Sequence, residues 1–218
     1  MRPGASCLRS RHEAIVWAME LFVATGNPHK LIELGPALPG HTLRLPSDAG
    51  IESFEVAEDG SSFLENAVKK AKALFSIVGE PSLADDSGLV VRALDGAPGV
   101  LSARYGSAGG SHRLEAAERN AYLLANMAGK EDRSCAFVCC LVLVLSEERL
   151  FAVQEACSGI LLSEPIGSGG FGYDPVVYLP QLGKSVAQLS VHEKNRLSHR
   201  GRACARLAAL MAEIEAEP

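Results

Sequence analysis

The sequence predicts an α/β protein built around a mixed β-sheet. Three observations support this class: short apolar runs typical of buried strands, apolar residues that recur at helical spacing, and a long β-hairpin pattern. The hairpin consists of the apolar runs 135–145 and 150–157, which flank a polar turn at 146–149. Because a hairpin is antiparallel while the other strands alternate with helices, we expect a mixed sheet rather than an all-parallel one.

The N-terminal elements follow in chain order. Residues 1–18 lack the sustained apolar segment of a signal peptide, so we expect a disordered tail or a misassigned start ahead of Met19. A single domain is then expected over residues 19–218. Residues 21–25 are typical of a buried strand, and a helix is expected from Pro28 to about residue 38, before Pro39-Gly40.

The strongest helix pattern covers residues 63–78. Ser62 and Glu65 fit a capping box, and apolar residues recur at helical spacing behind them until Gly79. A short apolar run at 82–84 leads into the polar Asp85-Asp86-Ser87-Gly88, after which residues 89–94 are expected to form another strand. Further helices are expected at 112–128 and 198–215, the second with Ser198 as its N-cap.

The composition excludes several classes of function. The chain is 47% hydrophobic and carries a formal net charge of −5, which is ordinary for a globular protein and opposite to the balance of a nucleic-acid binder. It contains no apolar run of about 18 residues that could form a transmembrane helix, so no membrane partner is expected. Its six cysteines form no paired CxxC set and are expected to be reduced, buried thiols.

The segment TGNPHK at 25–30 lies where a strand leads into a helix. Backbone N–H groups at such a turn, together with the helix dipole, favour an anion, and Lys30 can add a positive charge for phosphate. The second glycine and the Lys-Ser/Thr pair of a Walker A loop are missing. An ordinary strand–helix turn is therefore the alternative.

Asp85 and Asp86 are adjacent carboxylates that follow an apolar run. Neighbouring strand residues point to opposite faces, so only one of them is expected to face a cleft. Carboxylate oxygens suit Mg²⁺, and a carboxylate beside such an ion can take a proton from an attacking water. An Asx-type turn is the alternative. Glu58-Asp59, just before the capped helix, is a second acidic group.

Two segments in the last third of the chain have unusual composition. In the glycine-rich run 167–175, Phe171 and Tyr173 offer flat rings that can stack on a base, a contact worth roughly 1–3 kcal/mol; a flexible loop with a hydrophobic plug is the alternative. His199 and Arg200 fall in the first turn of a helix, where a cation opposes the dipole. Such local conflicts often mark function.

Together these segments resemble the inosine triphosphate pyrophosphatase family, also called the Ham1-like family of non-canonical purine NTP pyrophosphatases. The matching stretches occur in the family's order: TGNPHK at 25–30, EDGSSFLENAVKKA at 58–71, ADDSGL at 84–89, GAPGVLSARY at 96–105, GGFGYDP at 169–175 and SHRG at 198–201. The resemblance spans residues 20–210. Ala57 departs from it, because many members carry an acidic residue there.

The resemblance implies an elongated two-lobed fold with a central substrate cleft, a cytoplasmic homodimer and a requirement for Mg²⁺. The implied reaction is attack of water on the α-phosphorus of ITP, dITP, XTP or dXTP, which yields the monophosphate and pyrophosphate. Asp86 matches the family's general base and metal ligand, Glu58 lies in its metal-binding stretch, and Asp85 is a further candidate ligand. The implied substrate contacts are Thr25, Gly26, Asn27, Pro28, His29, Lys30, Lys70, Ser87, Phe171, Gly172, Tyr173, Asp174, Lys194, His199 and Arg200.

Other functions fit parts of the pattern. A Maf-like or all-α NTP pyrophosphatase would act on modified pyrimidines, but SHRG and GGFGYDP argue against it. A nucleotide-binding sensor without turnover would keep the pocket, but the intact Lys30, Asp85 and Asp86 argue for catalysis. A protein in which all these glycines and acids are structural would not need six such segments in order.

Overall fold

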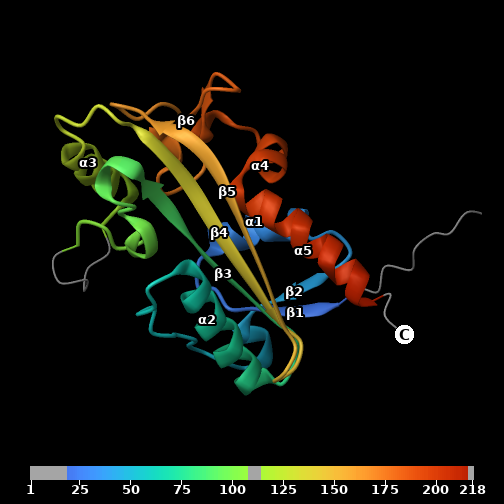
Figure 1. Cartoon of the computed structure of the whole chain (residues 1–218). Coiled ribbons are helices and arrows are strands. Elements are labelled where there is room, and N and C mark those ends of the chain that lie inside the picture. Colours follow the sequence, from blue (N-terminus) through green and yellow to red (C-terminus); the bar gives the residue numbers. More distant parts are fainter. Residues whose placement is uncertain (1–18, 108–113, 216–218) are drawn as a thin grey trace, which may run out of the picture.

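Seven strands form one mixed sheet in the order β2-β1-β3-β4-β5-β6-β7 (Figure 1). The computed structural model describes residues 19–107 and 114–215. β1 pairs in parallel with β2 and β3, and all later pairs are antiparallel. The predicted mixed sheet is therefore confirmed, with the predicted hairpin as β4–β5. The strands are β1 (Glu20–Val23), β2 (Thr42–Arg44), β3 (Ser82–Val91), β4 (Ser134–Val144), β5 (Leu150–Leu161), β6 (Val177–Leu179) and β7 (Lys184–Ser185).

Five helices flank this sheet in the described part of the chain. Those predicted at 28–38, 63–78 and 198–215 are confirmed to within a residue, whereas α4 was not expected. The helix predicted at 112–128 is shorter, and its first two predicted residues, like the predicted tail 1–18, lie outside the described residues. The helices are α1 (Pro28–Ala37), α2 (Phe63–Val78), α3 (Ala116–Asn126), α4 (Val191–Leu197) and α5 (His199–Glu215).

The alternation of side chains along β4 defines the two faces of the sheet. Leu141 and Leu143 pack in one core cluster with residues of α1 and α5. Val142 and Val144 pack in another with residues of α2 on the opposite face. A third cluster lies toward α3, at the far end of the long strands β3, β4 and β5 (Figure 1). The fold is therefore elongated, with two lobes joined by three continuous strands, as expected.

The polar segment in the middle of β3 is part of that strand. Residues 82–84 and 89–94 were expected to be separate strands, but Ser82–Val91 is continuous and pairs with β4 along its whole length. The strand tolerates buried carboxylates because cations from three helices reach them, as described below. Gly88 allows a close approach: an added Cβ would lie 2.6 Å from the carbonyl oxygen of Gly99.

Two consecutive helices, α4 and α5, bring the basic residues of the C-terminal segment together. Ser198 Oγ accepts a hydrogen bond from the Gly201 N–H at 3.1 Å and caps α5, as predicted. A Cβ on Gly201 would lie only 1.8 Å from the Asn195 carbonyl oxygen, so glycine lets α5 pack directly against α4. Lys194 lies in α4, next to the start of α5. The Ser190–Glu193 capping box was the overlooked signal for α4.

In the described residues, no helix combines the length and the apolar character that a membrane crossing requires.

Candidate active site

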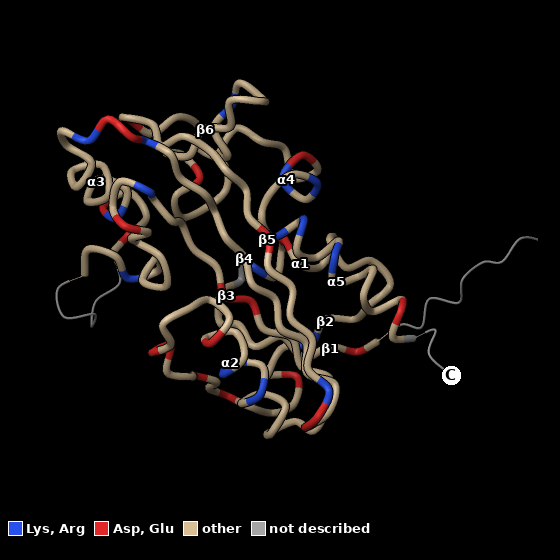
Figure 2. Tube along the Cα trace, viewed as in Figure 1, with Lys and Arg blue, Asp and Glu red and all other residues tan. Residues whose placement is uncertain are grey.

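Asp85 and Asp86 lie in the middle of β3 and point to opposite faces of the sheet, as strand geometry predicts. Figure 2 shows the acidic positions on this part of β3, between the two lobes. On one face, Asp85 meets residues of α1 and α5; on the other, Asp86 meets a residue of α2. The Asx-turn alternative is thus wrong, because both residues adopt extended strand structure.

Four side chains donate to the carboxylate of Asp85, which is 1% exposed. Lys30 Nζ and Ser87 Oγ contact Oδ1 at 2.6 and 2.8 Å. Arg200 Nε and Cys139 Sγ contact Oδ2 at 2.6 and 3.5 Å. Burial alone would raise the pKa of this carboxyl, but Arg200 and Lys30 hold it well below its usual range.

The predicted role of Asp85 as a metal ligand stays a prediction, and in this structure its carboxylate has protein partners. Both carboxylate oxygens are engaged by protein donors, and the group lies on the face away from Asp86. Its position orders Lys30 from α1 and Arg200 from α5. Arg200 lies in the first turn of α5, where a cation opposes the helix dipole. Asp85 and Glu33 both pair with its guanidinium and so offset this unfavourable interaction.

The carbonyl oxygen of Asp85 lies at an open part of the edge of β3. β1 ends at Val23, opposite Leu83, and does not extend as far as Asp85. The Asp85 carbonyl accepts hydrogen bonds from Lys30 Nζ at 3.0 Å and from Lys70 Nζ at 2.9 Å. The two lysines therefore converge beside the carboxyl end of β1, where ligands bind in open α/β sheets.

Asp86 and Glu58 share the ammonium of Lys70, which donates to each carboxylate at 2.8 Å. Burial raises the pKa of Asp86 because one shared cation only partly offsets the loss of water. The more exposed Glu58 has a lowered pKa, since Lys70 outweighs its burial. Asn66 of α2 also approaches Asp86, at 3.4 Å.

Arg104 holds the loop that carries Glu58 and was missed by the sequence analysis. Its guanidinium donates to the Glu58 carbonyl oxygen at 2.6 Å and lies 4.0 Å from the carboxylate. Arg104 belongs to the SARY part of the 96–105 segment, which had been matched without a role for this residue. The available signal for Arg104 was its position as a basic residue within the 96–105 segment, which resembles the family.

Residues of α1, α4, α5 and the glycine-rich loop form a second buried charge network. Glu33 lies between the cations Arg200 and Lys194, with 2.5 Å to Lys194 Nζ. Lys194 also donates to Asp174 Oδ2 at 2.7 Å, and that same oxygen accepts from the Phe171 N–H at 2.8 Å. Burial raises the pKa of Asp174 despite its contact with Lys194. Glu33, which the sequence analysis did not select, thus links the aromatic loop to Arg200.

A small pocket of about 220 Å³ opens next to this network. Its lining includes Ile32 and Glu33 of α1, Phe171 of the glycine-rich loop and Lys194 of α4. Lys194 Nζ lies 4.8 Å from the centre of the Phe171 ring. The volume is below the roughly 300–1,000 Å³ of most small-molecule sites, so the pocket has room for only part of such a ligand.

Three residues predicted to contact the substrate are buried and are not among the residues that line this pocket. Tyr173 is buried, and its hydroxyl donates to the Ser102 carbonyl at 2.9 Å. His199 is buried and stacked on Phe137, and its Nδ1 has no hydrogen-bond partner within the described structure. Burial and the nearby Arg200 lower the pKa of His199 well below its usual value, so it is neutral at pH 7. Arg200 is 1% exposed, and its three nitrogens contact Asp85, Glu33 and Ser87.

The remaining predicted contacts lie in the turn before α1, at the start of α1 and in the glycine-rich loop. Thr25, Gly26 and Asn27 form the turn between β1 and α1, in which Thr25 Oγ1 accepts from the Asn27 N–H at 3.1 Å. Pro28 and His29 begin α1, and their side chains are outside the described part of the structure. Gly172 accepts a hydrogen bond at its carbonyl from Asn120 of α3, at 3.1 Å.

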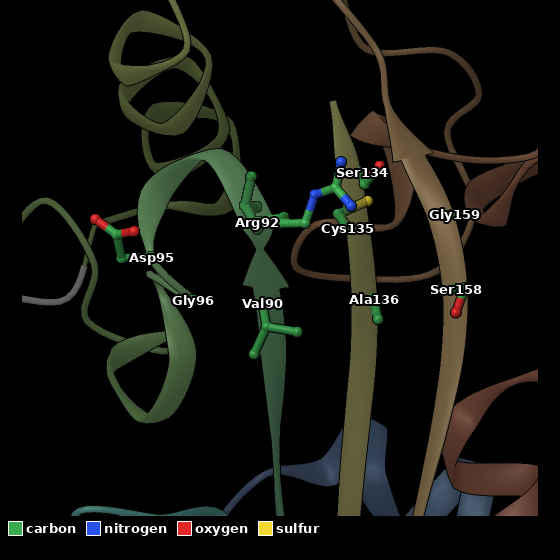
Figure 3. Close-up of a pocket in the computed structure, with 10 residues that line it drawn as sticks. Val90, Arg92, Asp95, Gly96, Ser134, Cys135, Ala136, Ser158 and Gly159 are labelled. Carbon is green, nitrogen blue, oxygen red and sulfur yellow. The ribbon is translucent and has the colours of Figure 1, made fainter. Parts of the chain in front are cut away.

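A larger hollow of about 560 Å³ lies at the far ends of β3, β4 and β5 (Figure 3). Val90, Arg92, Ala136 and Ser158 contribute to its lining. It is open to solvent, and none of the predicted site residues takes part in it. The charged residues around Asp85 and Asp86, rather than this hollow, therefore form the candidate active site.

The sequence model of the Ham1 family matches residues 21–210 of this chain. The chain belongs to the Ham1 family. The prediction from its motifs is thereby confirmed, and the Maf-like and all-α alternatives are excluded. The buried charges described above therefore belong to a Ham1 family protein.

Relatives and solved structures agree with this membership. The chain is 51% identical to a dITP/XTP pyrophosphatase of Treponema denticola, over 85% of this chain and 94% of that protein. It is 45% identical to the Thermus thermophilus protein of the same name, over 85% and 88%. A HAM1 protein structure from Coxiella burnetii has a TM-score of 0.80 at 35% identity and covers 89% of this chain and 99% of that one.

Proposed function

We propose that this chain hydrolyses non-canonical purine nucleoside triphosphates, such as ITP, dITP, XTP and dXTP, to the monophosphate and pyrophosphate, and so clears them from the nucleotide pool. The observation that carries the proposal is the convergence of Lys30, Lys70, Glu58 and Asp86 at the open edge of β3. Two cations can face a polyphosphate there, and two carboxylates can serve metal binding and proton transfer. The relatives named dITP/XTP pyrophosphatase support the same activity.

The donor set around Lys70 fits Mg²⁺. Glu58 and Asp86 offer hard carboxylate oxygens that converge on one point, and Mg²⁺ characteristically uses one or two carboxylates with substrate phosphates. Ala57 has no side-chain donor, so Glu58 is the acidic ligand of this loop. A bound Mg²⁺ supplies polarisation of a phosphate oxygen and a lowered pKa for bound water.

Asp86 is the proposed general base. Its carboxylate is 10% exposed, so it can reach a substrate water while remaining largely desolvated. The raised pKa makes it a better proton acceptor than an ordinary aspartate. Lys30 and Lys70, which both donate to the Asp85 carbonyl oxygen, would offset the negative charge of the substrate phosphates. No covalent nucleophile is required.

The pocket beside Phe171 is the proposed base site. Phe171 supplies an aromatic ring, and Lys194 supplies a cation at the lining. Arg200 supports this surface indirectly, because its buried guanidinium pairs with Glu33 and lies 5.7 Å from the centre of the Phe171 ring. His199 and Tyr173 are buried as well and are not among the lining residues. A 6-oxo purine presents an acceptor where adenine presents a donor, so the donor Lys194 at the lining would favour ITP over ATP.

The remaining family properties are also proposed for this chain. The resemblance to the Ham1 family implies a homodimer and a cytoplasmic location. The reduced, buried cysteines agree with a reducing compartment: Cys135, Cys139, Cys140, Cys157 and Cys204 are all free. Size-exclusion chromatography with light scattering would test the dimer, which a monomeric mass would contradict.

The proposed reaction can be tested by incubating the purified protein with Mg²⁺ and either ITP or GTP and measuring pyrophosphate release. We expect ITP to be cleaved much faster than GTP, and Asp86→Asn to abolish the release. If ITP binds but neither nucleotide is cleaved, the protein is a sensor rather than an enzyme.

A further inference from the structure

The ammonium of Lys70 lies where three oxygens of the candidate site meet. Nζ donates to Glu58 Oε1 at 2.8 Å, to Asp86 Oδ1 at 2.8 Å and to the Asp85 carbonyl at 2.9 Å. Lysine has three protons to donate, so these contacts use its whole donor capacity. The Lys70 side chain is only 9% exposed, which makes the contacts difficult for water to replace.

The two carboxylates bound by Lys70 are the ones that the proposed function assigns to Mg²⁺. Each bound oxygen lies 2.8 Å from the same nitrogen, so the two oxygens can be no more than twice that distance apart. The ammonium already binds both, and a divalent ion at either oxygen would compete with it. Like charges at such short range repel strongly in a partly buried site.

We propose that Lys70 is a built-in counter-cation that keeps divalent metal off Glu58 and Asp86 until a triphosphate draws its ammonium away. The inference rests on the proposed function, in which Lys70 contacts phosphate and the two carboxylates bind metal. A triphosphate offers Lys70 new anionic acceptors, and the flexible lysine stem allows the head group to move. The released carboxylates then need another cation, so metal and nucleotide enter together.

The neighbouring Lys69 provides a matched control. It lies next to Lys70 on α2 and also pairs with an acid of the same loop, Asp59, at 2.6 Å. However, its side chain is 44% exposed, and Asp59 is 73% exposed. Removing the charge of Lys69 changes the net charge by the same amount as removing that of Lys70, without freeing the candidate metal ligands.

The test is a Mn²⁺ titration of the purified protein without nucleotide at pH 8, followed by the electron paramagnetic resonance signal of free Mn²⁺. Wild type would be compared with Lys70→Met, Lys70→Gln and Lys69→Met, after circular dichroism has confirmed folding. A unit charge within about 4–6 Å shifts an ionic equilibrium by one to three powers of ten, so both Lys70 variants should bind Mn²⁺ at least about tenfold more tightly. Lys69→Met should resemble wild type.

The proposal is overturned if folded Lys70 variants bind Mn²⁺ no more tightly than wild type, or if Lys69→Met gains as much. The Lys70→Gln variant serves if Lys70→Met does not fold. Adding Asp86→Asn to a Lys70 variant should remove the gain, because one of the two freed carboxylates is lost. Normal ITP cleavage by wild type with unchanged Mn²⁺ affinity in the Lys70 variants would refute this inference alone; absent cleavage by wild type would count against the proposed function.

Discussion

Replacing Asp85 by asparagine should strongly destabilise the fold. Lys30 and Arg200 would lose the anion that both of them contact at 2.6 Å. Removing one partner of a buried ion pair typically costs about 3–5 kcal/mol, because a buried charge is left uncompensated. Arg200 keeps its contact with Glu33, and Lys30 is 14% exposed, so we expect the lower end, about 3 kcal/mol.

Asp86→Asn is the matched control on the other face of the same strand. The pKa of Asp86 is raised, so the fold does not favour its ionised form and a neutral amide should cost little. Lys70 keeps Glu58 and the Asp85 carbonyl as partners. We therefore expect a loss of about 1 kcal/mol or less, as for a typical hydrogen bond.

The assay is urea unfolding at pH 7.5 and 25 °C, followed by circular dichroism. A loss of about 3 kcal/mol should also lower the melting temperature by roughly 6–12 °C for a chain of this size. The reasoning is refuted if Asp85→Asn costs less than about 1 kcal/mol, or if Asp86→Asn costs as much as Asp85→Asn.

Three further predictions concern pH, the aromatic loop and the α4–α5 contact. The folded state lowers the pKa of Asp85, so the stabilising effect of this carboxylate is complete above the unfolded pKa of about 3.9 and is lost as the pH falls toward the folded pKa. The difference in unfolding free energy between wild type and Asp85→Asn should therefore become smaller below about pH 4. A difference that stays constant with pH would contradict this reasoning. Asn120→Ala removes the hydrogen bond from Asn120 to the Gly172 carbonyl, which supports the glycine-rich loop. We expect kcat/KM for ITP to fall about tenfold and the free energy of unfolding in the urea assay to fall by about 1–2 kcal/mol. Unchanged kinetics would argue against a positioning role for Asn120. Gly201→Ala places a Cβ 1.8 Å from a carbonyl oxygen of α4 and should lower the free energy of unfolding by about 1–3 kcal/mol. Gly35→Ala on α1 is the control, because its Cβ meets no atom within 4 Å and the change should be neutral or stabilising. Thermal melts of both variants would show the difference.

Local sequence signals predicted much of the fold. The capping residues Ser62 and Glu65 fixed the start of α2, although Glu65 binds the backbone N–H of Ser61 rather than that of Ser62. The two apolar runs and the polar turn between them predicted the β4–β5 hairpin. The continuity of β3 was not predicted, because Asp85 and Asp86 interrupt the apolar pattern. Their burial depends on Lys30, Lys70 and Arg200, which no local window of sequence contains.

The candidate site was predicted in its parts. The order of motifs identified the family and most of the residues that converge on β3. Glu33 and Arg104 were missed because each acts through a partner far away in the chain: Glu33 pairs with Arg200, and Arg104 with the Glu58 carbonyl. Glu33 has no local pattern that distinguishes it from an ordinary surface charge, and Arg104 is marked only by its place in the 96–105 segment.

By itself, the sequence determined most of the helices, the mixed sheet with its long hairpin and the chemical types that the site contains, since periodicity, capping and motif order are local properties. Only the tertiary structure decided which of two adjacent aspartates serves as a buried counter-ion and which stays accessible. Strand alternation separates Asp85 and Asp86, but it does not say which face carries α1 and α5 and which carries α2. The free energy of a charge depends on its burial and on its neighbours in space, and both are fixed only when distant segments pack together.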